Sequence, residues 1–201
     1  MGTNNSHEHR AVFLDRDGVI NRNIFNPATG EYEAPLTPAD FEIMPGALDA
    51  LRALQSAGFL LFLVSNQPNY AKGKSSLAEL RAIHQKFVEG LFRSVICFAR
   101  FYYCLHHPQG VGNRFSRPCE CRKPSPYFLL KAQAEFNLNI RQCWMIGDRH
   151  TDVECGNRAG TRTMLIAEGA SCLSDGAYAD EIAVSLEDAA TIILQRGYGA
   201  K

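Results

Sequence analysis

Two pairs of aspartates lie directly after apolar runs in the sequence, where their carboxylates could together hold a metal ion. Asp15 and Asp17 stand two residues apart at the end of one apolar run, and Asp148 and Asp152 stand four residues apart after another. Carboxylates from separate loops are the oxygen ligands that Mg²⁺ prefers, and bound Mg²⁺ also takes a substrate phosphate. The alternative is that these are ordinary turn residues or helix caps. D-x-D-G alone more often indicates a turn or cap, and Asp152 can cap the helix that it opens.

Four polar residues can be assigned to the steps of phosphoryl transfer. Asp15 is the candidate nucleophile, which would accept the phosphoryl group as an aspartyl phosphate. Asp17 would donate a proton to the leaving oxygen and then take one from water. Lys123 would offset charge on the phosphoryl oxygens, and Ser65 would donate a hydrogen bond to them. The order D-x-D, S-N, K, G-D-x-x-x-D along one chain is much harder to obtain by chance than any one of its parts.

Three cysteines and a histidine form a second candidate site, whose ligands suit zinc. Cys104-x-His106 is separated by twelve residues from Cys119-x-Cys121. Four protein ligands leave no open position on tetrahedral zinc, so we expect the ion to be structural. The intervening loop is polar and rich in Gly and Pro, so a metal would supply the stability that a core cannot. Chance clustering of buried cysteines is the alternative, and His107 competes with His106 as a ligand.

Composition limits the class of protein. The chain has 201 residues, 46% of them hydrophobic and 21% charged, and its formal net charge is zero. These are the values of an ordinary globular domain, and zero net charge disfavours a general nucleic-acid or membrane-surface binder. The start of the chain is polar and has no apolar region of the kind found in signal peptides, and no apolar run is long enough to cross a membrane. The chain has seven cysteines, and an odd number argues against a disulfide framework. We therefore expect a cytoplasmic monomer that acts on a small molecule, without nucleic-acid or membrane partners.

Apolar runs alternate with helical patterns along the chain, which predicts an α/β fold. The expected form is Rossmann-like, three-layer α/β/α, with a central mostly parallel sheet and no separate cap domain. Strands are expected at residues 11–14, 59–64, 101–103, 143–146, 163–166 and 182–184. The first helix is expected to follow Pro45-Gly46 and to run through Ala57. Further helices are expected with Ser75 or Ser76 and with Ser125 as caps, and over residues 152–159 and 186–195. Residues 21–45 are expected to form a long loop, residues 1–10 a mobile tail, and residues 11–201 a single domain with an inserted zinc loop at 104–121.

The candidate residues follow the ends of the predicted strands. Ligands bind outside the carboxyl ends of the strands in parallel sheets, so we expect the aspartates, Ser65 and the zinc loop to meet at one edge. The segment from residue 113 to 123, near that edge, has a local charge of +3. It contains four basic residues and one acidic residue: Arg114, Arg117, Arg122, Lys123 and Glu120. Such a charge can bind a second phosphate of the substrate, and the alternative is a solvated basic loop.

In these motifs the chain resembles the haloacid dehalogenase (HAD) superfamily of phosphatases. The resemblance rests on DRDGVIN from Asp15, SNQ from Ser65, CRKP around Lys123 and GD with a second aspartate four residues on. The cysteine loop, YCLHHPQG followed by CECRKP, narrows the resemblance to a zinc-loop group within the superfamily. The resemblance implies that Mg²⁺ is held by Asp15, the backbone carbonyl of Asp17 and Asp148. It also implies that zinc is held by the four ligands above and that Asn66 and Arg122 contact the substrate.

The zinc-loop group includes phosphatases of heptose bisphosphates and of histidinol phosphate. The resemblance therefore implies a sugar bisphosphate phosphatase that removes the C7 phosphate of D-glycero-D-manno-heptose 1,7-bisphosphate for lipopolysaccharide synthesis. The alternatives are a phosphatase of histidinol phosphate or another small ester, and a zinc-stapled binding module without catalysis. The group typically reads S/T-N-Q-S-G-I-A-R-G where this chain reads SNQPNYAKG, so Gln67, Pro68 and Lys72 are expected to contact the substrate at a site that differs from the group's.

Overall fold

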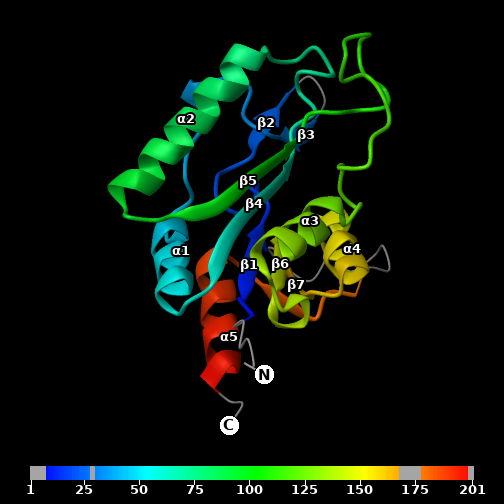
Figure 1. The fold of residues 1–201 in the computed structure, drawn as a ribbon. Coiled ribbons are helices and arrows are strands. Elements are labelled where there is room, and N and C mark those ends of the chain that lie inside the picture. The colour runs from blue at the N-terminus through cyan, green and yellow to red at the C-terminus, as the bar shows by residue number, and fades with distance from the viewer. Residues whose placement is uncertain (1–7, 28–29, 168–177, 199–201) are drawn as a thin grey trace.

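The fold of the chain was analysed in a computed structural model, which describes residues 8–27, 30–167 and 178–198. Six parallel strands form one sheet in the order β5-β4-β1-β6-β7-β8 (Figure 1). The strands are β1 (Ala11–Leu14), β4 (Leu60–Asn66), β5 (Phe98–Cys104), β6 (Trp144–Gly147), β7 (Arg162–Ile166) and β8 (Glu181–Ala183). The predicted α/β/α architecture with a parallel sheet is confirmed.

Helices cover both faces of this sheet. In Figure 1, α1 (Ala47–Ser56), α2 (Leu77–Arg93) and α5 (Leu186–Tyr198) lie on one side, and α3 (Tyr127–Phe136) and α4 (His150–Ala159) lie on the other. Side chains alternate along β1, so Val12 and Leu14 pack against the first set of helices and Phe13 against the second. All three are fully buried, which explains why the strand reads as one continuous apolar run.

The segment expected to be a long loop, residues 21–45, contains regular structure. Strands β2 (Ile24–Asn26) and β3 (Glu31–Glu33) pair antiparallel as a separate two-stranded sheet, and Pro38–Asp40 forms a 3-10 turn. The loop prediction was wrong here because both strands are only three residues long and mostly exposed, so they leave no apolar periodicity. We call β2 and β3 the hairpin. Figure 1 places it at the carboxyl end of β4.

Two of the predicted helix starts differ from the structure. Ser76 caps α2 as expected, since its side chain accepts a hydrogen bond from the backbone of Glu79. Helix α3 begins at Tyr127, with Pro126 rather than Ser125 in the cap position. Helix α4 begins at His150, two residues before the predicted start.

Part of the predicted N-terminal tail contacts the sheet region. Residues 1–7 lie outside the described residues. His9 pairs with the backbone of Asn137 and Asn139, and Arg10 donates to the carbonyl of Ala57 while stacking over Phe59. In the part of the chain that the structure describes, no helix has both the length and the apolar character needed to cross a membrane.

Candidate active site

Three carboxylates meet at the carboxyl end of the sheet. Asp15 follows β1, Asp148 follows β6, and Asp152 lies in the first turn of α4. Their ligand oxygens all lie within 4.8 Å of one another. Bringing three carboxylates this close is unfavourable unless a cation neutralises them, so the group suits a hard divalent ion with oxygen ligands.

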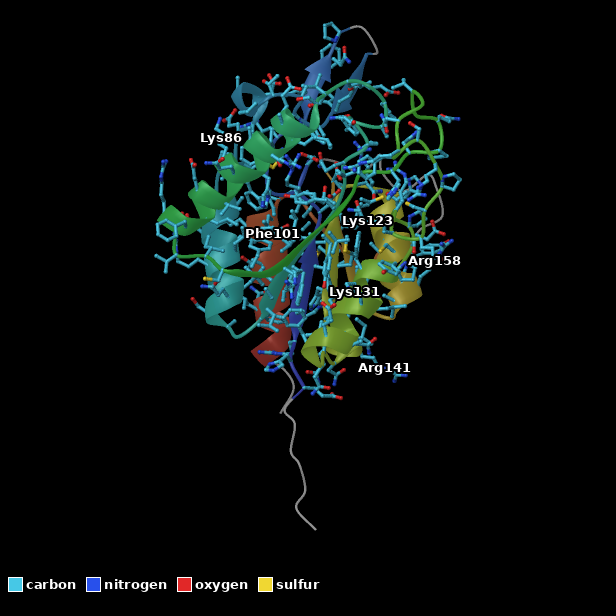
Figure 2. The ribbon with its side chains drawn as sticks, turned by 45° about the horizontal axis from the view of Figure 1, so that its top comes forward. Lys86, Phe101, Lys123, Lys131, Arg141 and Arg158 are labelled. Atoms are coloured by element: carbon cyan, nitrogen blue, oxygen red, sulfur yellow. The ribbon has the colours of Figure 1, made fainter. Side chains whose placement is uncertain are left out.

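Lys123 lies between two of these carboxylates. Its Nζ atom is 3.1 Å from Asp15 Oδ1 and 2.6 Å from Asp152 Oδ1, and it donates a hydrogen bond to the Val64 carbonyl at 2.7 Å. Only 3% of Lys123 is exposed. Burial alone would lower its pKa, but Asp15 and Asp152 outweigh burial and raise it, so the ammonium stays charged. Figure 2 labels Lys123 close to where α4 begins.

Asp148 has few hydrogen-bond donors, and its ion-pair partner, the exposed Arg149, lies 4.0 Å from its Oδ1. Its Oδ1 is buried without a hydrogen-bond partner, and its Oδ2 accepts only a long bond of 3.4 Å from Asn23. Burial raises the pKa of Asp148 to about 7, and the charges of Asp15 and Asp152 act in the same direction. A Cβ atom at Gly18, where φ is +81°, would overlap the Asp148 carboxylate, so glycine is required there. A buried carboxylate oxygen without a donor is what an oxygen-liganded metal would satisfy.

Asp152 serves both of the roles that the sequence left open. Its Oδ2 accepts a hydrogen bond from the Arg149 backbone at 3.1 Å, which satisfies the start of α4, and its Oδ1 pairs with Lys123. Burial raises the pKa of Asp152 to about 6, although Lys123 opposes that rise. Asp152, and not the side chain of Asp17, therefore completes the carboxylate cluster.

The Asp17 side chain is turned toward a set of buried donors. Its Oδ1 accepts hydrogen bonds from Arg16 Nε at 3.1 Å, Arg16 Nη2 at 2.9 Å and Asn21 Nδ2 at 3.0 Å. Its Oδ2 accepts a short bond from Gln67 Nε2. Arg16 is 1% exposed, and Asp17 faces the cavity described below. These four donors fix the orientation of a carboxylate that the sequence assigned to proton transfer.

The residues at the carboxyl end of β4 and directly after it bond to other protein groups. Gln67, expected to contact the substrate, is 2% exposed and donates to Asp17 and to Ser65 Oγ instead. Ser65 is also buried at the end of the strand. Asn66 donates to the Lys123 carbonyl at 3.2 Å and accepts from the Lys123 backbone N–H at 3.1 Å, so both ends of its amide hold the lysine in place.

A cavity of about 410 Å³ opens above the carboxylates. Asp15, Asp17, Lys123 and Asp152 line its floor, and four predicted substrate contacts, Asn66, Pro68, Lys72 and Arg122, line its walls. Burial and the neighbouring Lys74 and Arg122 lower the pKa of Lys72. This is the volume and the mixed polar lining expected of a site for a small molecule.

The hairpin forms one side of this cavity. Glu31, Tyr32 and Glu33 of β3 line it, and Lys74 Nζ lies 2.7 Å from each carboxylate oxygen of Glu33. The ion pair joins β3 to Lys74, which directly follows the segment SNQPNYAKG. That segment differs from the sequence typical of the zinc-loop group. Acidic side chains beside basic ones provide both acceptors for sugar hydroxyls and donors for phosphate.

The four predicted zinc ligands converge. Cys104 Sγ and Cys121 Sγ are each 3.5 Å from Cys119 Sγ, and His106 Nδ1 is 3.6 Å from Cys121 Sγ and 3.9 Å from Cys104 Sγ. These separations are close to the edges of a tetrahedron with metal–ligand bonds of about 2.0–2.3 Å. Burial raises the pKa of Cys104, so a bound cation would be needed to keep all three thiols ionised. The residues therefore fit zinc.

The zinc ligands and the carboxylate cluster are joined through three consecutive residues. Cys121 belongs to the zinc set, Arg122 donates to the His106 carbonyl at 3.3 Å and lines the cavity, and Lys123 enters the carboxylate cluster. His107 donates its backbone N–H to the Phe115 carbonyl and lies outside the set. The geometry therefore selects His106 over the alternative that the sequence left open.

Arg16 and Asn21 are the site residues that sequence reasoning missed. Asn21 belongs to the DRDGVIN motif, so its place in the motif was a signal, although its bond to Asp17 could not be read from it. Arg16 carried no signal, because a charged residue after a strand is normally solvated. It is buried only because Asp17 pairs with it and because the rings of Phe41 and Tyr103 lie beside its guanidinium.

The site and the fold were compared with known proteins. A family model described as HAD-hydrolase-like matches residues 120–189. The D-glycero-beta-D-manno-heptose-1,7-bisphosphate 7-phosphatase of Yersinia pestis is 34% identical over 89% of this chain and 92% of its own. The enzyme of the same name from Escherichia coli K12 is 33% identical over 78% of each chain. A crystal structure of D,D-heptose 1,7-bisphosphate phosphatase from B. bronchiseptica, complexed with magnesium and phosphate, is 26% identical, covers 93% of this chain and 99% of its own, and has a TM-score of 0.78.

The fold and the aspartate–lysine site define a phosphatase of the HAD superfamily. Within that superfamily, the chain belongs to the family of the D-glycero-D-manno-heptose 1,7-bisphosphate 7-phosphatases.

Proposed function

We propose that this protein is a Mg²⁺-dependent phosphatase that removes the C7 phosphate of D-glycero-β-D-manno-heptose 1,7-bisphosphate. The observation that carries the proposal is the contact of Lys123 with Asp15 on the floor of a cavity whose walls hold further cations. One phosphate needs one such anion site, and a bisphosphate needs two. The relatives' names supply the sugar and its anomer.

Asp15 is the nucleophile in this proposal. Its Oδ1 accepts the Arg16 backbone N–H at 2.7 Å and faces Lys123, while Oδ2 has no hydrogen-bond partner among the described residues. Oδ2 attacks phosphorus, the bond between phosphorus and the C7 oxygen breaks, and Asp17 gives that oxygen a proton. Water then attacks the aspartyl phosphate, Asp17 takes a proton from it, and Asp15 and inorganic phosphate are released.

Lys123 and Ser65 hold the transferring phosphoryl group. The ammonium of Lys123 offsets charge on the phosphoryl oxygens, and Ser65 donates its hydroxyl proton to one of them. Mg²⁺ would be held by Asp15, Asp148 and Asp152, with the Asp17 carbonyl as the further oxygen, and it would shield the incoming phosphate from the carboxylates. Zinc on Cys104, His106, Cys119 and Cys121 has a structural role.

Arg122 and Lys72 bind the second phosphate in this proposal. Both line the cavity, and the bond from Arg122 to the His106 carbonyl fixes one end of its guanidinium. A lysine offers a point charge where the family reads a bidentate arginine, so the C1 phosphate is held chiefly by Arg122. We further propose a cytoplasmic monomer whose product, heptose 1-phosphate, enters nucleotide-heptose synthesis.

The test is phosphate release with Mg²⁺ from both heptose 1,7-bisphosphate anomers, beside histidinol phosphate and fructose 1,6-bisphosphate. We expect kcat/KM for the β anomer to exceed the others by about a hundredfold. Loss of one charged hydrogen bond costs about 1.5–3 kcal/mol, so Arg122→Ala should raise KM for the bisphosphate about 10–100-fold and leave small monophosphates little changed. The control is Arg117→Ala, an exposed arginine of the same loop.

Two results would contradict parts of this proposal. Uniformly weak rates on all four substrates would be consistent with phosphatase activity but would exclude heptose 1,7-bisphosphate as the preferred substrate. Asp15→Asn is expected to abolish turnover without unfolding the protein, so retained activity in that variant would exclude Asp15 as the nucleophile.

A further inference from the structure

A second cavity of about 300 Å³ lies on the other side of Asp17 from the catalytic cavity. Its lining comes from α2, β5 and the zinc loop, and it shares no lining residue with the catalytic cavity. Arg16 and Gln67 form the wall between the two. Both line the second cavity, both donate to Asp17, and Asp17 lines the first. None of the residues that we assign to catalysis or to zinc lines this second cavity.

The charges around the second cavity are all positive. Arg81 of α2 and Arg114 of the zinc loop line it, and neither has an ion-pair partner among the described residues. No carboxylate lines it. Arg16 is neutralised by Asp17, and burial, with the charge of Arg16, lowers the pKa of His84, so His84 is neutral at pH 7. Two guanidinium groups without an ion-pair partner among the described residues therefore remain, both exposed at the rim of the cavity, where they can pair with an anion.

The rest of the lining is apolar. Leu77 and Leu80 of α2, Phe101 of β5 and Leu105 of the zinc loop contribute it, and Figure 2 labels Phe101 on the strand beside α2. A sugar phosphate would place hydroxyl groups against these side chains, which cannot accept their hydrogen bonds. The described lining offers few acceptors, one of which is Gln67 Oε1, a buried atom without a partner.

We propose that this second cavity binds a small organic anion with a compact apolar body, such as an aromatic carboxylate, and that its occupancy lowers phosphatase turnover. Arg81 and Arg114 would pair with the anionic group, and the leucines and Phe101 would contact the apolar body. Volumes near 300 Å³ are at the lower end of the range for small-molecule sites, which run from about 300 to 1,000 Å³.

The coupling to catalysis passes through residues of the second cavity that contact Asp17. His84 Nδ1 lies 3.0 Å from the Tyr103 hydroxyl, the Tyr103 ring lies beside the Arg16 guanidinium, and Arg16 Nη2 donates to Asp17 Oδ1. A ligand that moves Arg16 or Gln67 changes where the Asp17 carboxylate points. Misplacing a catalytic group by about 1 Å can cost about a hundredfold in rate, so an effect on kcat without one on KM is expected.

Binding can be measured without any assumption about the reaction. Isothermal titration of the zinc-loaded protein with 2-naphthoate should give one site. The neutral analogue 2-naphthamide should bind at least tenfold more weakly. The double variant R81Q/R114Q should weaken naphthoate binding at least tenfold, while R93Q/R117Q, which removes one exposed arginine from the same helix and one from the same loop, should not. Equal affinity in both double variants, or for both probes, would overturn the site.

The effect on turnover rests on the proposed phosphatase function. Saturating 2-naphthoate should lower kcat at least threefold with KM unchanged, and the kcat of R81Q/R114Q should be the same with and without naphthoate. A raised KM with constant kcat would place naphthoate in the catalytic cavity and refute the proposal. A further outcome is that the protein binds naphthoate as described above and yet hydrolyses no phosphate ester. That result would refute the phosphatase function but would support the second binding site.

Discussion

Replacing Lys123 with methionine tests whether its charge, and not its packing, holds the carboxylate cluster together. Methionine keeps an unbranched side chain of similar length and removes the ammonium. At an effective dielectric constant of 20, ion pairs at 2.6 Å and 3.1 Å are each worth about 5–6 kcal/mol before desolvation is subtracted. Removing one partner of a buried ion pair costs about 3–5 kcal/mol net, and we expect a loss of that size in the free energy of unfolding at pH 8.

The pH dependence of this loss separates charge from packing. The pKa of Lys123 is raised in the folded protein, so its own contribution is constant below about pH 10 and is lost only above that. Any change between pH 5 and 8 must come from the carboxylates. Asp152 already has a pKa of about 6, and without Lys123 it rises further. A raised carboxylate pKa stabilises the protonated folded form, so stability falls as pH rises from the unfolded value through the folded one. The deficit of Lys123→Met should therefore shrink at pH 5, by about 1.4 kcal/mol per unit of added pKa shift.

The assay is urea unfolding of the native protein and the variant at pH 5 and pH 8 in Mg²⁺-free buffer. Trp144, the one tryptophan of the chain, is buried at the start of β6 in the core and reports the transition by fluorescence. The control is Lys131→Met, which removes an exposed ion pair with Glu135 and should leave stability unchanged. An equal loss at both pH values would refute the electrostatic reasoning, because lost packing does not titrate.

Two further predictions concern the metals. Added Mg²⁺ should raise the melting temperature more at pH 8 than at pH 6, because Asp148, with a pKa of about 7, must release its proton before it can bind a cation; equal shifts in a thermal denaturation series would contradict this. Cys119→Ser should lower the zinc content measured by mass spectrometry and reduce kcat/KM at least tenfold, whereas Cys97→Ser, at an exposed cysteine outside the zinc set, should change neither. Full activity in zinc-free Cys119→Ser would mean that the zinc does not support the site.

The sequence predicted the sheet well, for a physical reason. Strands such as β1 and β4 are buried on both faces, so they read as unbroken apolar runs that end where the polar residues begin. The convergence of Cys104, His106, Cys119 and Cys121 could also be predicted, because residues of these types have few other reasons to cluster. The hairpin could not, since its strands bury little and their pairing depends on neighbours such as Lys74.

The roles around Asp17 were the hardest to infer from sequence. Gln67 and Arg16 lie within two residues of predicted catalytic positions, yet neither lines the catalytic cavity. Sequence spacing locates a residue along a strand end, but whether it faces the substrate or the protein depends on which donors and acceptors other loops supply. Gln67 faces Asp17 and Ser65 because both lie within its reach once β1 and β4 pair in register.

Lys123 is positioned from two independent directions, and this explains why a structural metal would matter for catalysis. Asn66 binds both backbone groups of Lys123 from the end of β4, and Cys121, two residues earlier, belongs to the zinc set. The lysine must stay within about 3 Å of Asp15 while its own loop is polar and contributes little to the core. Without the metal, only the Asn66 amide and the ion pairs themselves would oppose movement of the loop, and ordering a loop costs about 1–2 kcal/mol per residue. Zinc bound by these four residues would therefore affect turnover through the position of Lys123, although it would lie outside the reacting atoms.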